Sequence, residues 1–207
     1  MSKIKKVGVY GGTFSPPHIG HVSAAKAFIE QENLDELIIM PTYRSPHKEL
    51  SGSVTPIQRL DMCRLSFSHI DGVSVSDREI MRKGKSYTYL TLSEMISEKS
   101  DIRPVFLCGT DMILTFDKWY RFEDIFKMAD IVFIRRENDE LITEQIEAKT
   151  EEYINKYNAV VRELKTEPID ISSTELREMI SRGEDASPYL NKETEEYIKK
   201  WNIYQTK

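Results

Sequence analysis

The chain has 207 residues, of which 40% are hydrophobic and 30% charged, and its net charge at pH 7 is −5. This length and composition predict a globular protein, and we expect one domain over residues 1–207 with a helical C-terminal subregion from about residue 165. The acidic balance, without a block of basic residues, disfavours nucleic acid as a partner but is compatible with a local site for small phosphates.

The first residues lead directly into an apolar strand pattern without a signal peptide, and no apolar run approaches the roughly 18 residues of a membrane span. We therefore expect a cytoplasmic protein with no membrane partner. Cys63 and Cys108 lie in apolar runs and are expected to be reduced, packed thiols. The sequence leaves open whether the chain forms a homo-oligomer.

Short apolar runs alternate with helical periodicity along the chain. The pattern predicts strands at 4–10, 36–40, 73–75, 105–108, 131–134 and 160–164. It predicts helices at 19–31, 55–67, 87–98, 123–128, 141–157, 174–182 and 192–201. Such alternation is typical of a doubly wound, mainly parallel, Rossmann-like α/β sheet with helices on both faces. Ligands of such sheets bind beyond the carboxyl ends of the strands.

The segment after the first strand, residues 10–21, reads YGGTFSPPHIGH. Gly11 and Gly12 let backbone N–H groups approach a ligand closely, because no Cβ intervenes. The helix that begins next offers unpaired N–H groups and the positive end of its dipole, which both suit phosphate. His18 and His21, at i and i+3, point from one face toward the same anion. Residues 10–21 are therefore predicted to form a phosphate-binding turn, which we call the phosphate turn.

Other interpretations of this turn fit less well. It lacks the G-x-G-x-x-G pattern of dinucleotide sites and the G-x-x-x-x-G-K-[ST] pattern of a P-loop. Neither histidine belongs to a C-x-x-C or H-E-x-x-H pattern, so we predict no metal site built from protein ligands. A purely structural role for two of the four histidines remains the alternative.

A second candidate phosphate site lies near the C-terminus, where residues 170–177 read DISSTELR. Hydroxyls before an apolar-periodic stretch predict a helix start, with Ser172 or Ser173 as the N-cap. Arg177 lies one turn into this helix and can reach back to an anion at its N-terminus. The alternative is plain capping without a ligand.

Together, the two segments resemble the nucleotidyltransferase α/β superfamily, whose members carry G-x-F-x-P-x-H-x-G-H and, about 150 residues later, I-S-S-T-x-[IL]-R. The resemblance implies that the histidines hold the phosphates of a nucleoside triphosphate during attack on its α-phosphorus. The ATP-binding residues that it implies are Gly11, Gly12, Thr13, Phe14, His18, Gly20, His21, Gly109, Asp111, Ile171, Ser172, Ser173 and Arg177.

Three middle segments resemble the nicotinate-nucleotide adenylyltransferase family more narrowly. Pro-His-Lys at 46–48 resembles its basic loop, and Lys-Gly-Lys-Ser-Tyr-Thr at 83–88 resembles a turn that binds the pyridine carboxylate. Cys-Gly-Thr-Asp at 108–111, followed by Lys-Trp at 118–119, resembles its ribose and pyridine segment. The mononucleotide-binding residues implied are Ser15, Lys48, Ser86, Tyr87, Thr88 and Trp119. On local grounds alone, the N-cap of the next helix is nearly as good an interpretation of Asp111, and a buried anchor is the better interpretation of Trp119.

The resemblance implies an enzyme that transfers AMP from ATP to nicotinate mononucleotide, giving deamido-NAD and pyrophosphate. His18, His21, Lys48 and Arg177 are the implied catalytic residues, and Mg²⁺ is expected to arrive on the ATP phosphates and keep its waters. Because the attacking phosphate is already an anion, alignment and charge neutralisation suffice without a strong general base.

Two positions depart from the family pattern, since Ser15 and Leu90 stand where the family commonly carries Asp. These departures leave alternatives open: an adenylyltransferase for nicotinamide mononucleotide or phosphopantetheine, a cytidylyltransferase, or a nucleotide-binding sensor without turnover. Trp119 and the turn at 86–88 favour a pyridine nucleotide.

Overall fold

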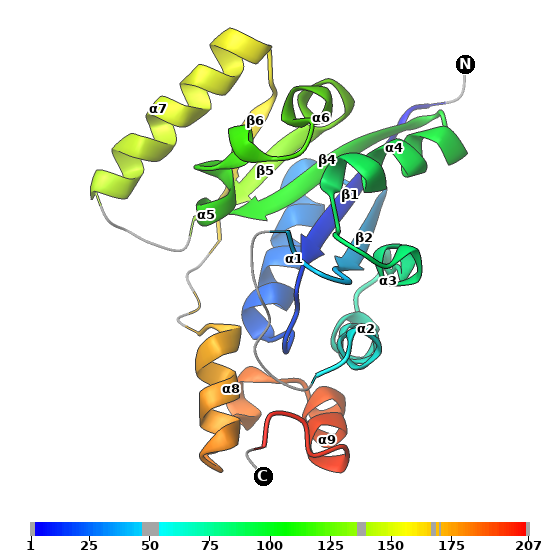
Figure 1. Ribbon diagram of the computed structural model, residues 1–207, viewed down its shortest axis with the longest axis vertical. Coiled ribbons are helices and arrows are strands. Elements are labelled where there is room, and N and C mark those ends of the chain that lie inside the picture. Colours follow the sequence, from blue (N-terminus) through cyan, green and yellow to red (C-terminus); the bar gives the residue numbers. More distant parts are fainter. Residues whose placement is uncertain (1–2, 47–53, 136–139, 167–168, 170, 206–207) are drawn as a thin grey trace. The chain divides into compact units, whose positions relative to one another are not determined.

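The computed structural model describes residues 3–46, 54–135, 140–166, 169 and 171–205 (Figure 1). Within them, the strands are β1 (Lys5–Gly12), β2 (Glu36–Pro41), β3 (Val73–Val75), β4 (Ile102–Gly109), β5 (Asp130–Ile134) and β6 (Val161–Leu164). They form one sheet in the order β3-β2-β1-β4-β5-β6. The pairs β1–β4, β4–β5 and β5–β6 are parallel, and the predicted doubly wound α/β fold is confirmed.

The strand order places a topological switch point at β1 and β4, the two central strands. The chain runs outward through β2 and β3 on one side and then returns to β4 before it runs outward through β5 and β6. Tyr10 pairs with Leu107 near the carboxyl ends of the two strands. Both strands end in the glycine-containing segments that the sequence singled out, and such switch points are where ligands of these sheets bind.

The long helices begin and end close to the predicted residues. They are α1 (Ile19–Glu32), α2 (Pro56–Phe67), α4 (Thr88–Glu98), α6 (Phe122–Met128), α7 (Glu140–Tyr157), α8 (Ser173–Ser181) and α9 (Lys192–Lys200). Hydroxyl and amide caps explain several starts: Thr55 caps α2 in a capping box with Gln58, and Asn191 caps α9. None of the described helices is long and apolar enough to cross a membrane.

Four short elements were not predicted: α3 (Arg78–Arg82), α5 (Thr110–Ile113) and the 3₁₀ turns η1 (Phe116–Lys118) and η2 (Ser187–Tyr189). Each is too short to show a helical period. Strand β4 also begins three residues before the predicted start at 105, because Ile102 and Arg103 pair with Lys5 and Lys6 of β1 in spite of their partial exposure.

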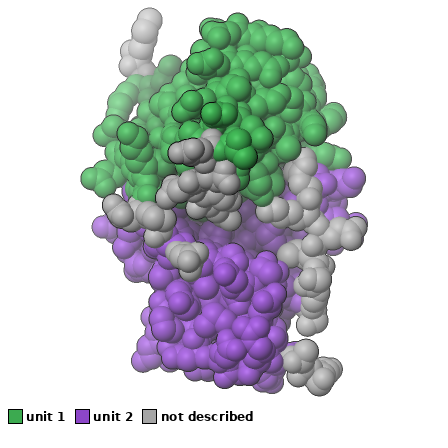
Figure 2. Space-filling model, turned by 90° about the vertical axis from the view of Figure 1, so that its left-hand side faces the viewer, with its two compact units in different colours: residues 1–11, 27–38, 87–166 green, residues 12–26, 39–86, 167–207 purple. Residues whose placement is uncertain are grey.

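The chain divides into two compact units, coloured separately in Figure 2. Unit 1 consists of residues 1–11, 27–38 and 87–166. Its core includes the fully buried Val105, Leu107, Ile131 and Val132, since parallel strands are buried on both faces. An ion-pair network lies beside this core, formed by Lys6, Glu32, Arg103, Asp130 and Arg162.

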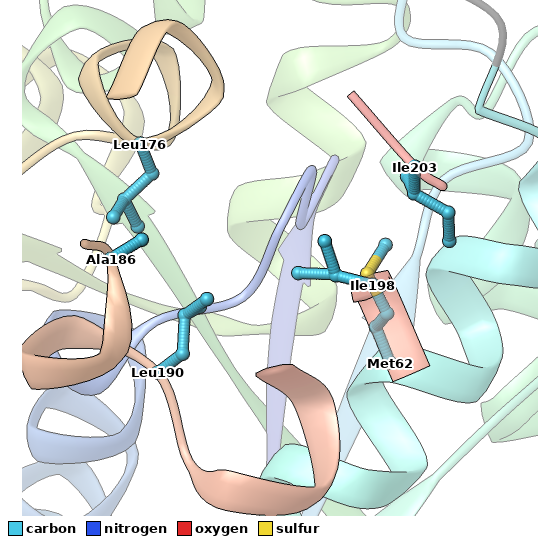
Figure 3. Close-up of a cluster of buried hydrophobic side chains, with 6 residues drawn as sticks. All are labelled: Met62, Leu176, Ala186, Leu190, Ile198 and Ile203. Carbon is cyan, nitrogen blue, oxygen red and sulfur yellow. The ribbon is translucent and has the colours of Figure 1, made fainter. Parts of the chain in front are cut away.

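Unit 2 consists of residues 12–26, 39–86 and 167–207. One of its hydrophobic clusters joins α2, α8, α9 and the segments between and after the last two helices (Figure 3). The cluster contains Met62, Leu176, Ala186, Leu190, Ile198 and Ile203, with Ile171 and Tyr204 packed against it. The C-terminal helices therefore pack against α2 within one unit.

Both cysteines are free and buried, as predicted. Burial raises the pKa of the Cys63 and Cys108 thiols, which keeps them neutral at physiological pH.

Candidate active site

The two histidines of the turn after β1 pack against each other in unit 2, with their rings tilted by 49°. Their ring centroids lie 3.8 Å apart, and both side chains are at least 90% buried. The backbone N–H of Gly20 donates to Nδ1 of His18, and that of His18 donates to Nδ1 of His21, each at 3.2 Å. A neutral imidazole that accepts on Nδ1 carries its proton on Nε2. The turn therefore sets both rings as Nε2–H donors.

Glycines make this geometry possible. A Cβ at Gly20 would lie 3.0 Å from Cε1 and Nδ1 of His18, and one at Gly12 would lie 2.9 Å from the ring of Phe14. Phe14 is buried with a φ of 48°, and its ring meets His21 edge-on at 5.1 Å. Side chains at the two glycine positions would displace the rings that shape the turn.

The start of α8 contacts the phosphate turn directly. Ser173 Oγ donates to the carbonyl of Pro16 at 2.9 Å, and Arg177 Nη1 donates to the carbonyl of Ser15 at 2.8 Å. Arg177 also reaches back along its own helix, donating to the Ser173 carbonyl at 3.1 Å and to Thr174 Oγ1 at 3.1 Å. Two motifs about 150 residues apart in sequence thus meet in one unit, with the guanidinium at the helix N-terminus.

Ser172 caps α8 in a capping box. Its hydroxyl accepts from the Glu175 N–H, and Glu175 Oε2 accepts from the N–H and hydroxyl of Ser172 at 2.7 and 2.6 Å. The hydrogen bonds from Ser172 lower the pKa of the Glu175 carboxyl. The capping alternative is therefore present, and a phosphate at Ser172 would have to displace this carboxylate.

The loop after β2 is tied to the Ser86 turn within unit 2. Ser86 is buried, and its Oγ accepts from the Tyr43 N–H at 3.0 Å, while its own N–H donates to the Arg44 carbonyl at 2.9 Å. Ser86 thus orders this loop and does not cap α4, whose N-cap is Tyr87. Lys48, farther along the loop, lies outside the described residues.

In unit 1, Gly109 ends β4 and is the N-cap of α5. Asp111 is exposed in the first turn of that helix and does not cap it. A Cβ at Gly109 would lie 3.0 Å from Asp111 Oδ1, so the glycine gives this carboxylate its place at the strand end. An exposed carboxylate at the end of a central strand is suited to ribose hydroxyls.

Trp119 follows η1 and is half-buried. Its ring stacks on the fully buried Phe116 with centroids 4.6 Å apart and an interplanar angle of 17°. It therefore serves as an anchor, yet its partial exposure leaves surface that a ligand ring can cover. Nearby in the same unit, Tyr87 packs 5.0 Å from Tyr120, and Thr88 is the first residue of α4.

Two residues of unit 2 that the sequence did not assign to the site contact the phosphate turn. Arg59 of α2 is fully buried and binds carbonyls of the phosphate turn and of the loop after β2. Tyr204, near the C-terminus, has its hydroxyl 3.0 Å from Ser15 Oγ. Arg59 could have been found from helical spacing, since it shares the buried face of α2 with Cys63 and Phe67.

A central parallel sheet and two contacting segments that the sequence predicts to bind phosphate agree with the class of nucleotidyltransferases. In agreement, a family model described as cytidylyltransferase-like matches residues 9–179. A relative from Listeria monocytogenes serotype 4a, named "probable nicotinate-nucleotide adenylyltransferase", is 35% identical over 202 residues and 98% of each chain. A relative of the same name from Listeria welshimeri serovar 6b is 37% identical with the same coverage.

Among solved structures, the nicotinic acid mononucleotide adenylyltransferase of Plasmodium falciparum complexed with NaAD shares the fold, with a TM-score of 0.73 at 18% identity over 97% of each chain. From its full-length likeness to the Listeria relatives, this chain belongs to the nicotinate-nucleotide adenylyltransferase family.

Proposed function

We propose that this protein transfers AMP from ATP to nicotinate mononucleotide, giving deamido-NAD and pyrophosphate in NAD biosynthesis. The observation that carries the proposal is the contact between the phosphate turn and the start of α8, through Ser173 and Arg177. That contact gathers two histidines, a guanidinium and a helix N-terminus in one unit, which is a set of donors suited to a polyphosphate. The full-length relatives support the choice of substrates.

In this reaction, a phosphate oxygen of the mononucleotide attacks the α-phosphorus of ATP in line, and pyrophosphate leaves. His18 and His21 donate from Nε2 to oxygens of the α- and β-phosphates, where charge develops in the transition state. Arg177, Ser173 and Lys48 hold the β- and γ-phosphates, and Ser172 joins them when Glu175 turns away. The backbone from Gly11 to Phe14 and at Gly20 lines the triphosphate, and Ile171 contributes its backbone since its side chain packs in the apolar cluster.

Mg²⁺ fits this site as a companion of ATP. The described residues include no group of three or more His, Cys, Asp and Glu side chains that could hold a metal ion, and the polar side chains from Thr13 to His21 are those of Thr13, Ser15, His18 and His21. The ion would therefore be held mainly by phosphate oxygens and water, as Mg²⁺ commonly is in nucleotide sites. When bound, it neutralises charge on the leaving pyrophosphate.

The mononucleotide contacts are proposed residue by residue. Trp119 covers the pyridine ring, and the segment Ser86–Thr88 binds its carboxylate through backbone groups. Asp111 and Gly109 are assigned to ATP, whose ribose hydroxyls they contact. Ser15 contributes through its backbone or through its hydroxyl. We propose that the chain works as a single nucleotidyltransferase domain of residues 1–207 in the cytoplasm, where ATP is available.

The test is pyrophosphate release with ATP and Mg²⁺, using nicotinate mononucleotide, nicotinamide mononucleotide and phosphopantetheine as separate acceptors. We expect the highest kcat/KM with nicotinate mononucleotide. Equal or better turnover with the amide would overturn the substrate assignment. ATP binding without release for any acceptor would instead identify a nucleotide-binding sensor.

A further inference from the structure

Arg59 is a buried cation that no described carboxylate pairs with. The side chain lies on α2 and is fully buried. Nη1 donates to the Thr13 carbonyl at 2.8 Å, and Nη2 donates to the carbonyls of Thr42 and Tyr43 at 2.6 and 3.1 Å. Its bonds to the described residues are thus all to main-chain oxygens.

These carbonyls belong to two different loops. Thr13 lies in the phosphate turn, next to Phe14, and Thr42 and Tyr43 open the loop that follows β2. The Thr42 N–H also donates to the Gly12 carbonyl at 2.9 Å. The guanidinium therefore joins the two loops, because its planar group of donors is directed to carbonyls of each.

The charge on Arg59 is not neutralised by its described neighbours. Burial lowers its pKa, while the nearby Cys63 and Tyr204 favour the charged form only slightly. Burial raises the pKa of both of those groups, so they are neutral at physiological pH. A buried cation without a counter-ion is costly, and carbonyl bonds offset only part of that cost.

Two buried polar atoms here also lack a partner among the described residues. They are Nε of Arg59 and Oγ1 of Thr42. Native proteins rarely leave such atoms unbonded unless they serve a site. Among the described residues, a cation without a counter-ion and two polar atoms without a partner thus lie against the phosphate turn and the loop after β2, an arrangement suited to a nearby anion.

We propose that Arg59 is a positioning residue for ATP: it fixes the backbones of both loops and supplies the buried positive charge that a polyphosphate neutralises. This inference rests on the proposed function, because the anion is the triphosphate of that reaction. If Arg59 is merely structural, its substitution changes the stability of the protein alone. If Arg59 positions ATP, its substitution also changes the affinity for the nucleotide and the salt dependence of that affinity.

The experiment measures the Kd of a non-hydrolysable ATP analogue with a methylene group between the α- and β-phosphorus atoms, by calorimetry at several salt concentrations, together with Tm. Arg59→Lys keeps the charge and loses the planar group of donors, while Arg59→Met loses both. Arg64→Met is the matched control, since Arg64 lies on the same helix with its side chain 52% exposed.

We expect Arg59→Lys to weaken binding about 3- to 10-fold with unchanged salt dependence. Arg59→Met should weaken it by more than about tenfold, equal to about 1.4 kcal/mol, with a shallower salt dependence, and Arg64→Met should bind as the wild type does. Wild-type affinity in a folded Arg59→Lys protein overturns the inference, even where Arg59→Met does not fold. The binding measurement needs no acceptor. If the wild-type protein binds the ATP analogue but does not turn over ATP, only the proposed function is contradicted. If the wild-type protein does not bind the analogue, both the proposed function and the role of Arg59 are contradicted.

Discussion

The hydroxyl oxygens of Ser15 and Tyr204 lie 3.0 Å apart, joining the phosphate turn to a residue 189 positions later. Ser15 is 98% buried, and its carbonyl accepts from Arg177. Burial raises the pKa of Tyr204 in spite of the opposing effects of Ser15, Arg177 and Arg59, so the phenol remains protonated. The C-terminal segment is thereby part of what holds the turn in place.

Removing this hydroxyl should loosen the turn. We expect Tyr204→Phe to lower the free energy of unfolding by about 1 kcal/mol, since it leaves the Ser15 hydroxyl without this partner. The KM for ATP and the KM for the mononucleotide should both rise several-fold, because Tyr204 holds Ser15, a proposed mononucleotide contact within the turn that binds the triphosphate. Urea unfolding and initial-rate kinetics measure the two effects. If both KM values and stability match the wild type, the C-terminal segment has no part in the site.

His18 tests the phosphate turn itself. We expect His18→Ala to reduce kcat by roughly 10²–10³, the usual cost of losing one donor to developing charge, with circular dichroism unchanged. His69→Ala is the control, because His69 is an exposed histidine of the same unit. A near-normal kcat in His18→Ala would refute the role proposed for the imidazole.

Much of the candidate site could be proposed from the sequence because its signals are local. The glycines, the paired histidines and the serine-rich helix start are each contained in a few consecutive residues, and the structure brings the two segments together. Arg59 was missed since an arginine in a helix is usually solvated, and its burial depends on carbonyls from two distant loops. Tyr204 was missed because its partner Ser15 lies 189 positions earlier in the chain. The cost of burying either residue is offset only in the folded chain, where distant segments supply the partners.

Trp119 anchors its segment by stacking on Phe116, and its partly exposed ring is proposed to cover the pyridine. Kinetics can separate the packing role from the binding role. We expect Trp119→Ala to raise the KM for nicotinate mononucleotide about tenfold, since aromatic stacking contributes about 0.5–1.5 kcal/mol beyond area burial, and to leave the KM for ATP unchanged. Trp119→Phe should recover most of the affinity. Trp201→Ala, at an exposed tryptophan, is the control. Equal increases in both KM values would indicate only a loss of packing.

Acid should weaken unit 1 through Glu32 and Asp130. Burial acts to raise the pKa of each carboxyl, but hydrogen bonds from Arg162 and from Lys6 or Arg103 outweigh it and lower both pKa values below the ordinary 4.5 and 3.8. Because the pKa values are lower in the folded protein than in the unfolded chain, the ionised carboxylates stabilise unit 1 fully at a pH above their ordinary pKa values. This stabilisation is lost as the pH falls through the lowered pKa values of the folded protein.

Arg162→Met should therefore cost about 2 kcal/mol at pH 7, less than the 3–5 typical of fully buried pairs since Arg162 is partly exposed. The difference from wild type should shrink at pH 3.5, as measured by urea unfolding. Lys3→Met, at an exposed pair with Asp35, should change little at either pH. A difference that is independent of pH would show that packing, and not the ion pairs, accounts for the loss.

The fate of the mononucleotide's phosphate oxygens tests adenylyl transfer most directly. The protein is given ATP, Mg²⁺ and nicotinate mononucleotide whose phosphate carries ¹⁸O, and the products are analysed by mass spectrometry. Attack on the α-phosphorus predicts that deamido-NAD retains the label and that the pyrophosphate is unlabelled. Label in the pyrophosphate, or turnover without the dinucleotide, would contradict the account.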